Sequence, residues 1–333
     1  MRDEPTMRQR FDRSTSGARL AWAMAAPLIV CFWGPSPALA QSDNGSFYVW
    51  PVQRNVYVLV GAGGNITLSV GKDGVLMVDT GVAEMTGRVL DKVQELSRNL
   101  DPSGPTRPIR YIVNTHLDPE HMGGNSGIVE SAFFRPLDGG ERVIAHDNVV
   151  QRMIAARERP APSAIPTHTY LTEQHRVNRF FNGEGVQVIH IPAAHTDGDS
   201  IVYFRYSDVI STGDVISIDQ YPIIDLERGG SIQGLLDGIN RIIDLIFPEF
   251  RSQGGTMVVP GHGRICDLTE VAYYRDMVTM IRDRIRHAME KGMTLEEVKA
   301  ARLTFDFDPV YGRQPGSADR FVQSVYRSLS EGK

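Results

Sequence analysis

Histidine and carboxylate residues follow short apolar stretches at four separate points of this 333-residue sequence. Imidazole nitrogens and carboxylate oxygens are the side-chain groups that bind divalent metal ions, and bound ions can activate water for hydrolysis. A single such residue more often caps a strand or holds a loop, but four strand ends that offer these groups beside glycine jointly indicate a metal centre. The candidate ligands are His116, Asp118, Glu120, His121, His195, Asp214 and His262.

The apolar stretches before these residues have the composition of short buried strands. Residues 109–113, 186–191, 209–211 and 256–259 each precede one of the four polar groups. Further strands are predicted between Phe47 and Gly81, where apolar and polar residues alternate around a Lys-Asp-Gly turn. The chemistry is therefore predicted to lie in loops at strand ends, where rigid elements can position it.

Helical patterns alternate with these strands. Residues 84–100, 149–157 and 267–291 carry apolar side chains at three- and four-residue spacing, and Thr294 with Glu297 predicts a capping box at the start of a last helix. The alternation predicts an α/β fold. A composition of 41% hydrophobic and 23% charged residues is typical of a globular chain.

The first forty residues have the features of a secretory signal peptide. Arginines precede an apolar run from Leu20 to Trp33, and Ala38-Leu39-Ala40 supplies a small-x-small cleavage site. We therefore expect a signal peptide at 1–40, one domain at 41–333 and a mature protein that is periplasmic or secreted. A retained anchor is the alternative, but the run is short for a bilayer, so we expect no stable membrane anchor after processing.

The net charge of the chain limits the classes of molecule that it can bind. The net charge is −5, and loss of residues 1–40, with five arginines and three acids, makes it −7. This argues against broad electrostatic binding to nucleic acid or anionic lipid and favours a small-molecule substrate. Only Cys266 remains in the mature chain, so no internal disulfide is possible. The oligomeric state stays open.

The four groups taken together resemble the metallo-β-lactamase superfamily of metal-dependent hydrolases, over roughly residues 56–262. The family motif HxHxDH corresponds to residues 116–121, and the later His, the "TGD" Asp and the "PGHG" His correspond to His195, Asp214 and His262. The stretches "AHTDGDSIVYF" and "YPIIDLERGGS" resemble an exported branch of the family. The resemblance implies an αββα sandwich with a dinuclear metal site at one edge of its two sheets.

The first motif departs from the family pattern and reads HxDxEH, with Asp118 in place of His and Glu120 in place of Asp. Both replacements can bind a metal through oxygen. With Asp214 they give three carboxylates where the family pattern has two. We therefore expect a less positive site that binds two divalent ions, zinc in the first place, and tolerates manganese or iron better.

The resemblance also implies a role for each residue. One ion would be held by His116, Asp118 and His195, the other by Glu120, His121 and His262, with Asp214 as the bridge. A hydroxide held by the metal would attack a small ester, lactone, thioester or amide, with Glu120 and Asp214 as the catalytic carboxylates. Tyr221 and Asp225 follow Asp214 in the chain and are predicted to contact substrate.

Two other functions stay open at this point. A class B-like β-lactamase is favoured by export, because β-lactams are met in the periplasm, but Asp214 occupies a position where such enzymes usually carry Cys or Ser. A catalytically weakened binding protein of this fold is the other alternative, because Asp118 and Glu120 alter the motif. Near the site, Asp79 is predicted to hydrogen-bond loop backbone, and His146 to start a helix.

Overall fold

The computed structural model describes residues 47–137, 142–156, 160–177, 180–247 and 255–332. The predicted signal peptide and its cleavage site lie outside these residues. Among the described residues, no helix combines the length and the apolar character needed to cross a membrane.

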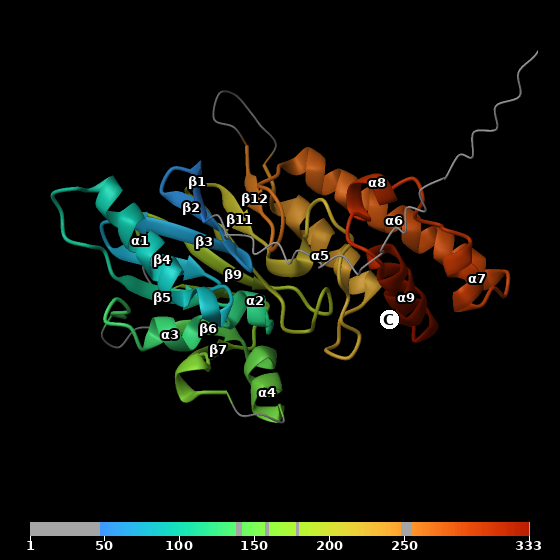
Figure 1. Cartoon of the computed structure of the whole chain (residues 1–333), viewed down its shortest axis with the longest axis horizontal. Coiled ribbons are helices and arrows are strands. Elements are labelled where there is room, and N and C mark those ends of the chain that lie inside the picture. The colour runs from blue at the N-terminus through green and yellow to red at the C-terminus, as the bar shows by residue number, and fades with distance from the viewer. Residues whose placement is uncertain (1–46, 138–141, 157–159, 178–179, 248–254, 333) are drawn as a thin grey trace, which may run out of the picture. The chain divides into compact units, whose positions relative to one another are not determined.

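Two β-sheets form the centre of the fold (Figure 1). The first sheet has antiparallel strands β1 to β4 followed by β5, β6 and β7, which continue parallel to β4. Its strands are β1 (Tyr48–Gln53), β2 (Val56–Ala62), β3 (Gly64–Gly71), β4 (Gly74–Val78), β5 (Ile109–Val113), β6 (Val143–His146) and β7 (His168–Tyr170). The second sheet has the order β12-β11-β10-β9-β8, and only β11 and β12 are parallel. Its strands are β8 (Gln174–Arg176), β9 (Val186–His190), β10 (Ser200–Phe204), β11 (Val209–Ser211) and β12 (Met257–Val259).

Alternation along the strands places most apolar residues of the described chain in three main cores, and a smaller fourth cluster contains Ala145 of β6 and Val149. In β4, Leu76 and Val78 belong to the core between the two sheets, whereas Met77 packs in the core on the other face of the first sheet. In β10, Val202 faces the same inter-sheet core and Ile201 faces the opposite side of the second sheet. Successive side chains of a strand point to opposite faces, so each sheet is covered by apolar contacts on both sides.

Helices cover the outer face of each sheet (Figure 1). Val89 and Val93 of α1 (Thr86–Leu100) pack in the outer core of the first sheet. Helices α5 (Ile232–Leu245), α6 (Leu268–Glu290) and α9 (Ser317–Ser330) pack in the outer core of the second sheet. Three cores between four layers make the predicted αββα sandwich, which is thereby confirmed. The shorter helices are η1 (Ala83–Met85), α2 (Pro119–Met122), α3 (Asn125–Val129), α4 (Asp147–Ala155), η2 (Pro162–Ala164), η3 (Gly213–Val215), α7 (Leu295–Ala300) and α8 (Asp308–Tyr311).

Two long helices were not predicted from the sequence. Helix α5 contains Gly234 and Gly238, which lower helix propensity. A Cβ at Gly238 would come within 2.6 Å of Ile191, so the glycine lets the helix lie close to the second sheet. Helix α9 follows the capping box at Thr294, so α7 is not the last helix of the chain.

Hydrogen bonds link the two sheets near one edge. The Asn65 side chain, in β3, donates to the carbonyl oxygens of Pro260 and Gly263, each at 2.9 Å. The Thr67 hydroxyl donates to Ser211 Oγ at 3.0 Å. These bonds hold the end of β12, and the loop after it, against the first sheet.

Candidate metal centre

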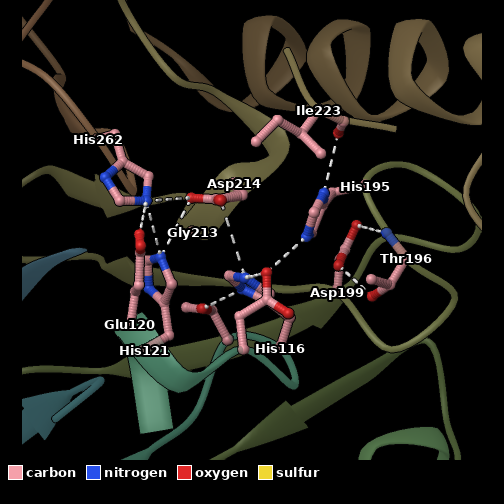
Figure 2. Close-up of polar contacts among 12 residues, drawn as sticks. His116, Glu120, His121, His195, Thr196, Asp199, Gly213, Asp214, Ile223 and His262 are labelled. Atoms are coloured by element: carbon pink, nitrogen blue, oxygen red, sulfur yellow. Dashed lines mark hydrogen bonds and ion pairs between the residues drawn. The ribbon is translucent and has the colours of Figure 1, made fainter. Parts of the chain in front are cut away.

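The strand ends bring the predicted ligands together at one edge of the sandwich (Figure 2). His116 comes from the end of β5, and His121 lies on the short helix α2 that follows. His195, Asp214 and His262 follow β9, β11 and β12 of the second sheet. The centre is thus built from both sheets.

A first group of possible ligand atoms comes from His116, Asp118, His195 and Asp214, and these atoms lie within 4.8 Å of one another. Asp118 Oδ2 lies 3.4 Å from His116 Nε2 and 3.1 Å from His195 Nε2. Asp214 Oδ2 lies 3.9 Å from His116 Nε2. The group contains the three residues that the resemblance assigned to one ion, together with the proposed bridge.

A second group comes from His121, Asp214 and His262, again within 4.8 Å. Asp214 Oδ1 lies 3.2 Å from His121 Nε2 and 3.6 Å from His262 Nε2. Because Asp214 points one oxygen toward each group, it occupies the bridging position between them.

Glu120 lies at the rim of the second group. Its side chain is 55% exposed, and Oε2 lies 3.2 Å from His262 Nε2. Figure 2 shows the carboxylate directed toward the His262 ring from α2 below. Glu120 does not belong to the second group, whose ligand atoms come from His121, Asp214 and His262. Its role as a metal ligand therefore stays a prediction.

The donor set fits a divalent cation. Within the part of the chain that the structure describes, His116 Nε2 and Asp214 Oδ1 are buried and have no hydrogen-bond partner. Buried polar atoms in proteins are almost always satisfied, and two orphans that face a set of imidazoles and carboxylates are what a cation would satisfy. The two groups together contain four histidines, including His262, and two carboxylates.

Hydrogen bonds at Nδ1 fix the orientation of the His195 and His121 rings. His195 Nδ1 lies 2.9 Å from the Ile223 carbonyl oxygen and donates to it (Figure 2). His121 Nδ1 lies 2.8 Å from Asp79 Oδ2. Each bond places the proton on Nδ1 and leaves the Nε2 lone pair for the centre, as is usual for histidine ligands.

Asp79 performs the role that the sequence predicted for it. Its Oδ1 accepts the Thr115 backbone N–H at 2.8 Å, so the prediction of a hydrogen bond to loop backbone is confirmed. Asp79 has a left-handed backbone with φ of 65°, which aspartate tolerates better than most residues.

The charged groups of the centre shift one another's pKa values. Burial alone would raise the pKa of Asp214, but the charges of His121, His116 and His262 hold it well below its usual range. Burial lowers the pKa of His195, but its hydrogen bond to Asp118 and the charges of Asp199, Asp214 and Asp118 together outweigh burial and raise the pKa to about 9. Without a cation, the carboxylates of the centre therefore hold protons on its imidazoles, and a cation would displace them.

Sequence reasoning missed one residue in contact with the centre. Arg228 donates to Asp118 Oδ1 and to the Leu117 carbonyl oxygen. Its Nε donates to Asp225 Oδ2 at 2.6 Å. Asp225 thus contacts the centre through Arg228, whereas its predicted contact with substrate stays a prediction. The only local signal was the i,i+3 spacing of Asp225 and Arg228, because Asp118 lies 110 positions away.

Tyr221 lies against the C-terminal helices. Its side chain is buried, its hydroxyl donates to Asp308 Oδ1 at 2.9 Å, and its ring stacks on Phe321 at 5.3 Å between centroids. The residue therefore anchors the loop that carries Ile223, and its predicted role in substrate contact stays a prediction. The hydroxyl is already engaged in this anchoring bond.

An apolar pocket opens beside His262. It has a volume of about 550 Å³, and its walls include Trp50, Val58, Val60 and Ile265. Arg264 also lines it, but this guanidinium is paired with Asp219 and Glu270. A substrate that reaches the centre from this side meets a mainly apolar wall.

Comparisons with known proteins agree with this geometry. The family model of the metallo-beta-lactamase superfamily matches residues 50–262, which include every candidate ligand. A curated relative, the linear primary-alkylsulfatase of Pseudomonas sp., is 20% identical over 301 residues, covering 77% of this chain and 53% of that protein. The chain thus spans about half the length of the curated relative it matches.

Solved structures show the same fold. The DIM-1 metallo-beta-lactamase superposes with a TM-score of 0.53 and 14% identity, over 70% of this chain and 97% of that one. The sec-alkylsulfatase Pisa1 from Pseudomonas sp. superposes with a TM-score of 0.58 and 17% identity, over 84% of this chain and 50% of that one. With the family model matching most of the chain, this protein belongs to the metallo-beta-lactamase superfamily.

Proposed function

We propose that this protein is a metal-dependent hydrolase of a small ester, lactone, thioester or amide. The observation that carries the proposal is the pair of ligand groups that share Asp214, with His116 Nε2 and Asp214 Oδ1 buried and unsatisfied between them. Asp118 retains a ligand oxygen at the position where the family pattern has His, so the variant motif keeps a donor there.

Divalent ions bound there would act as Lewis acids and provide a water-derived nucleophile near neutral pH. The chain's own residues divide the remaining tasks. Asp214 is buried and its pKa is held well below the usual range, so it stays ionised and serves as a ligand. Glu120 is the exposed carboxylate beside His262, so it can take up a proton from solvent or release one toward a leaving group.

The pocket beside His262 supports a substrate with an apolar portion. Trp50, Val58 and Val60 offer an apolar wall, and the scissile group would lie at the His262 end. Pockets of this size bind small organic molecules largely through apolar contacts, while a few polar groups orient them.

Sulfate-ester hydrolysis is a second candidate. Its support is the curated alkylsulfatase relative, which aligns with 77% of this chain. An alkyl sulfate would place its chain along the same apolar wall and its sulfate at the ligand groups. A β-lactamase and a binding protein without efficient chemistry remain narrower alternatives.

Metal analysis followed by a substrate panel tests the proposal. We expect the purified protein to hold one or two divalent ions per chain and to hydrolyse an ester, lactone, thioester or amide in a panel that includes a β-lactam and an alkyl sulfate. Trp50→Ala should lower kcat/KM for long-chain substrates more than for short ones, whereas Tyr48→Ala, on the same strand outside the pocket, should not. A protein with bound ions but no turnover would favour the binding-protein alternative.

We further propose that the protein is exported and acts in the periplasm or outside the cell. The support is the sequence alone, namely the arginine-rich start, the apolar run and Ala38-Leu39-Ala40.

A further inference from the structure

The two oxygens of Asp118 have different partners. Oδ2 faces the centre, 3.4 Å from His116 Nε2 and 3.1 Å from His195 Nε2. Oδ1 faces the other way and accepts a hydrogen bond from Arg228 Nη1. The carboxylate is therefore shared between a cation site and a guanidinium, and only one of its oxygens is directed at the centre.

Arg228 is held in place from several sides. Asp225 Oδ2 accepts from its Nε at 2.6 Å, and Asp225 Oδ1 accepts from its backbone N–H at 2.9 Å. The Arg228 carbonyl oxygen accepts from the Asp197 N–H at 2.9 Å, and the Asp225 N–H donates to the His195 carbonyl oxygen at the same distance. The guanidinium is thus fixed to the loop that carries His195 and is not a freely moving surface group.

Charge explains why these two residues occur together. A guanidinium this close to a divalent cation is unfavourable unless a carboxylate neutralises it. In the motif that the sequence resembles, position 118 is a histidine, which as a metal ligand is neutral. Asp118 and Arg228 taken as a pair are also neutral, although Arg228 shares its charge with Asp225, and the pair still presents one ligand atom to the centre.

We propose that Arg228 is a positioning residue that neutralises Asp118 and turns one carboxylate oxygen toward the cation site, so that the pair takes the place of a neutral imidazole ligand. The inference rests on the proposed function in so far as the ligand is a divalent cation. It also revises the expectation from the sequence, because Arg228, shared between Asp118 and Asp225, offsets part of the charge of the third carboxylate and makes the site more positive than a count of the motif carboxylates indicates.

The test is a double-variant cycle read out as affinity for Zn²⁺ and Mn²⁺. The whole protein is stripped of metal and titrated against a competing chelator, as wild type, Arg228→Gln, Asp118→His and the double variant. Arg228→Gln should tighten binding by about tenfold, since Asp118 loses its counter-charge. Asp118→His should weaken it by about tenfold, since an unpaired guanidinium then faces the cation. The double variant should return to within about threefold of wild type.

Two controls separate charge from a purely structural role. Arg228→Lys keeps the charge and should bind the ions nearly as wild type does. Arg152→Gln removes a guanidinium that pairs with Asp197 through two bonds of 2.7 and 2.6 Å, with similar exposure. It should lower thermal stability without changing metal affinity. Arg228→Gln and Asp118→His that change metal affinity in the same direction, or Arg228→Gln that behaves like Arg152→Gln, would overturn the inference and leave the metal site intact. A wild type that binds neither ion would instead overturn the proposed function, and this inference with it.

Discussion

His121 Nδ1 lies 2.8 Å from Asp79 Oδ2, and neither side chain is more than 3% exposed. Asp79 directly follows β4, whereas His121 lies on α2, which follows β5. The bond therefore joins the segments after two different strands of the first sheet. It fixes the tautomer of His121 and aims Nε2 at Asp214. Asp79, outside the two ligand groups, would thereby influence how well His121 binds a cation.

Asp79→Asn should disturb this arrangement. Asparagine presents one acceptor where Asp79 presents two, so either Thr115 or His121 loses its partner. We expect metal affinity to fall about 10- to 100-fold and the free energy of unfolding to fall by about 1–3 kcal/mol. Chelator competition and urea unfolding measure the two effects. Asp208→Asn is the matched control, since Asp208 also has a positive φ of 55° and accepts from Thr256 at 2.7 Å. It should lose stability only.

His195→Ala and His262→Ala remove ligands from different groups. Each variant should lose one ion of a bound pair and most activity, because a site with few ligands does not tolerate the loss of an imidazole. Elemental analysis of the purified variants gives the stoichiometry. His287→Ala removes an exposed histidine of α6 and should change neither property. Full metal content in both ligand variants would contradict the assignment.

His146 makes stability depend on pH. It caps α4 by accepting the Asn148 N–H, as the sequence predicted, and its ring stacks on His190 with centroids 3.5 Å apart. Burial and the neighbouring His190 lower its pKa to about 4. The unfolded chain takes up the proton near pH 6.5, well before the native state does, so stability falls as pH drops from about 6.5 to 4.

His146→Asn keeps an acceptor for the helix start and removes this titration. Urea unfolding between pH 7.5 and 4.5 should show a shallower loss of stability in the variant than in wild type. The exposed control His287→Asn should keep the wild-type slope. Equal slopes for wild type and His146→Asn would show that His146 does not titrate differently in the two states.

Processing is checked by intact mass. The exported protein should begin at Gln41, because Ala38-Leu39-Ala40 supplies the cleavage site. Replacing Ala38 and Ala40 by larger residues should leave the precursor uncleaved, since signal peptidase requires small side chains there. A mature mass that still includes residues 1–40 would exclude cleavage.

The sequence predicted those parts of the fold and the centre that depend on local pattern. Strand β5 has the predicted bounds, and the predicted capping box of Thr294 with Glu297 begins α7, because apolar runs and caps are encoded by near neighbours. The candidate ligands could be proposed for the same reason, since each of the four groups follows a strand of its own. Helix α5 was missed because its two glycines serve packing against Ile191 and Ala193, which no local pattern reveals.

Arg228 illustrates what local sequence patterns do not predict. Its partner Asp118 is distant in sequence and close only because two loops from different sheets meet. Counting the carboxylates in the motif therefore gave a charge for the site that the folded chain changes. Tyr221 illustrates the same point, since its position near Asp214 in sequence does not reveal that α8 and α9 engage it.

The origin of the ligands from both sheets has a consequence for the lifetime of the protein. An ion shared by His116 of the first sheet and Asp214 of the second would act as a clasp across the seam that Asn65 and Thr67 also bridge. Each tenfold rise in free metal above the dissociation constant would then add about 1.4 kcal/mol to the stability of the whole sandwich. The supply of metal in its compartment would thus set how long each molecule survives proteolysis, and a starved cell would lose the protein as well as its activity.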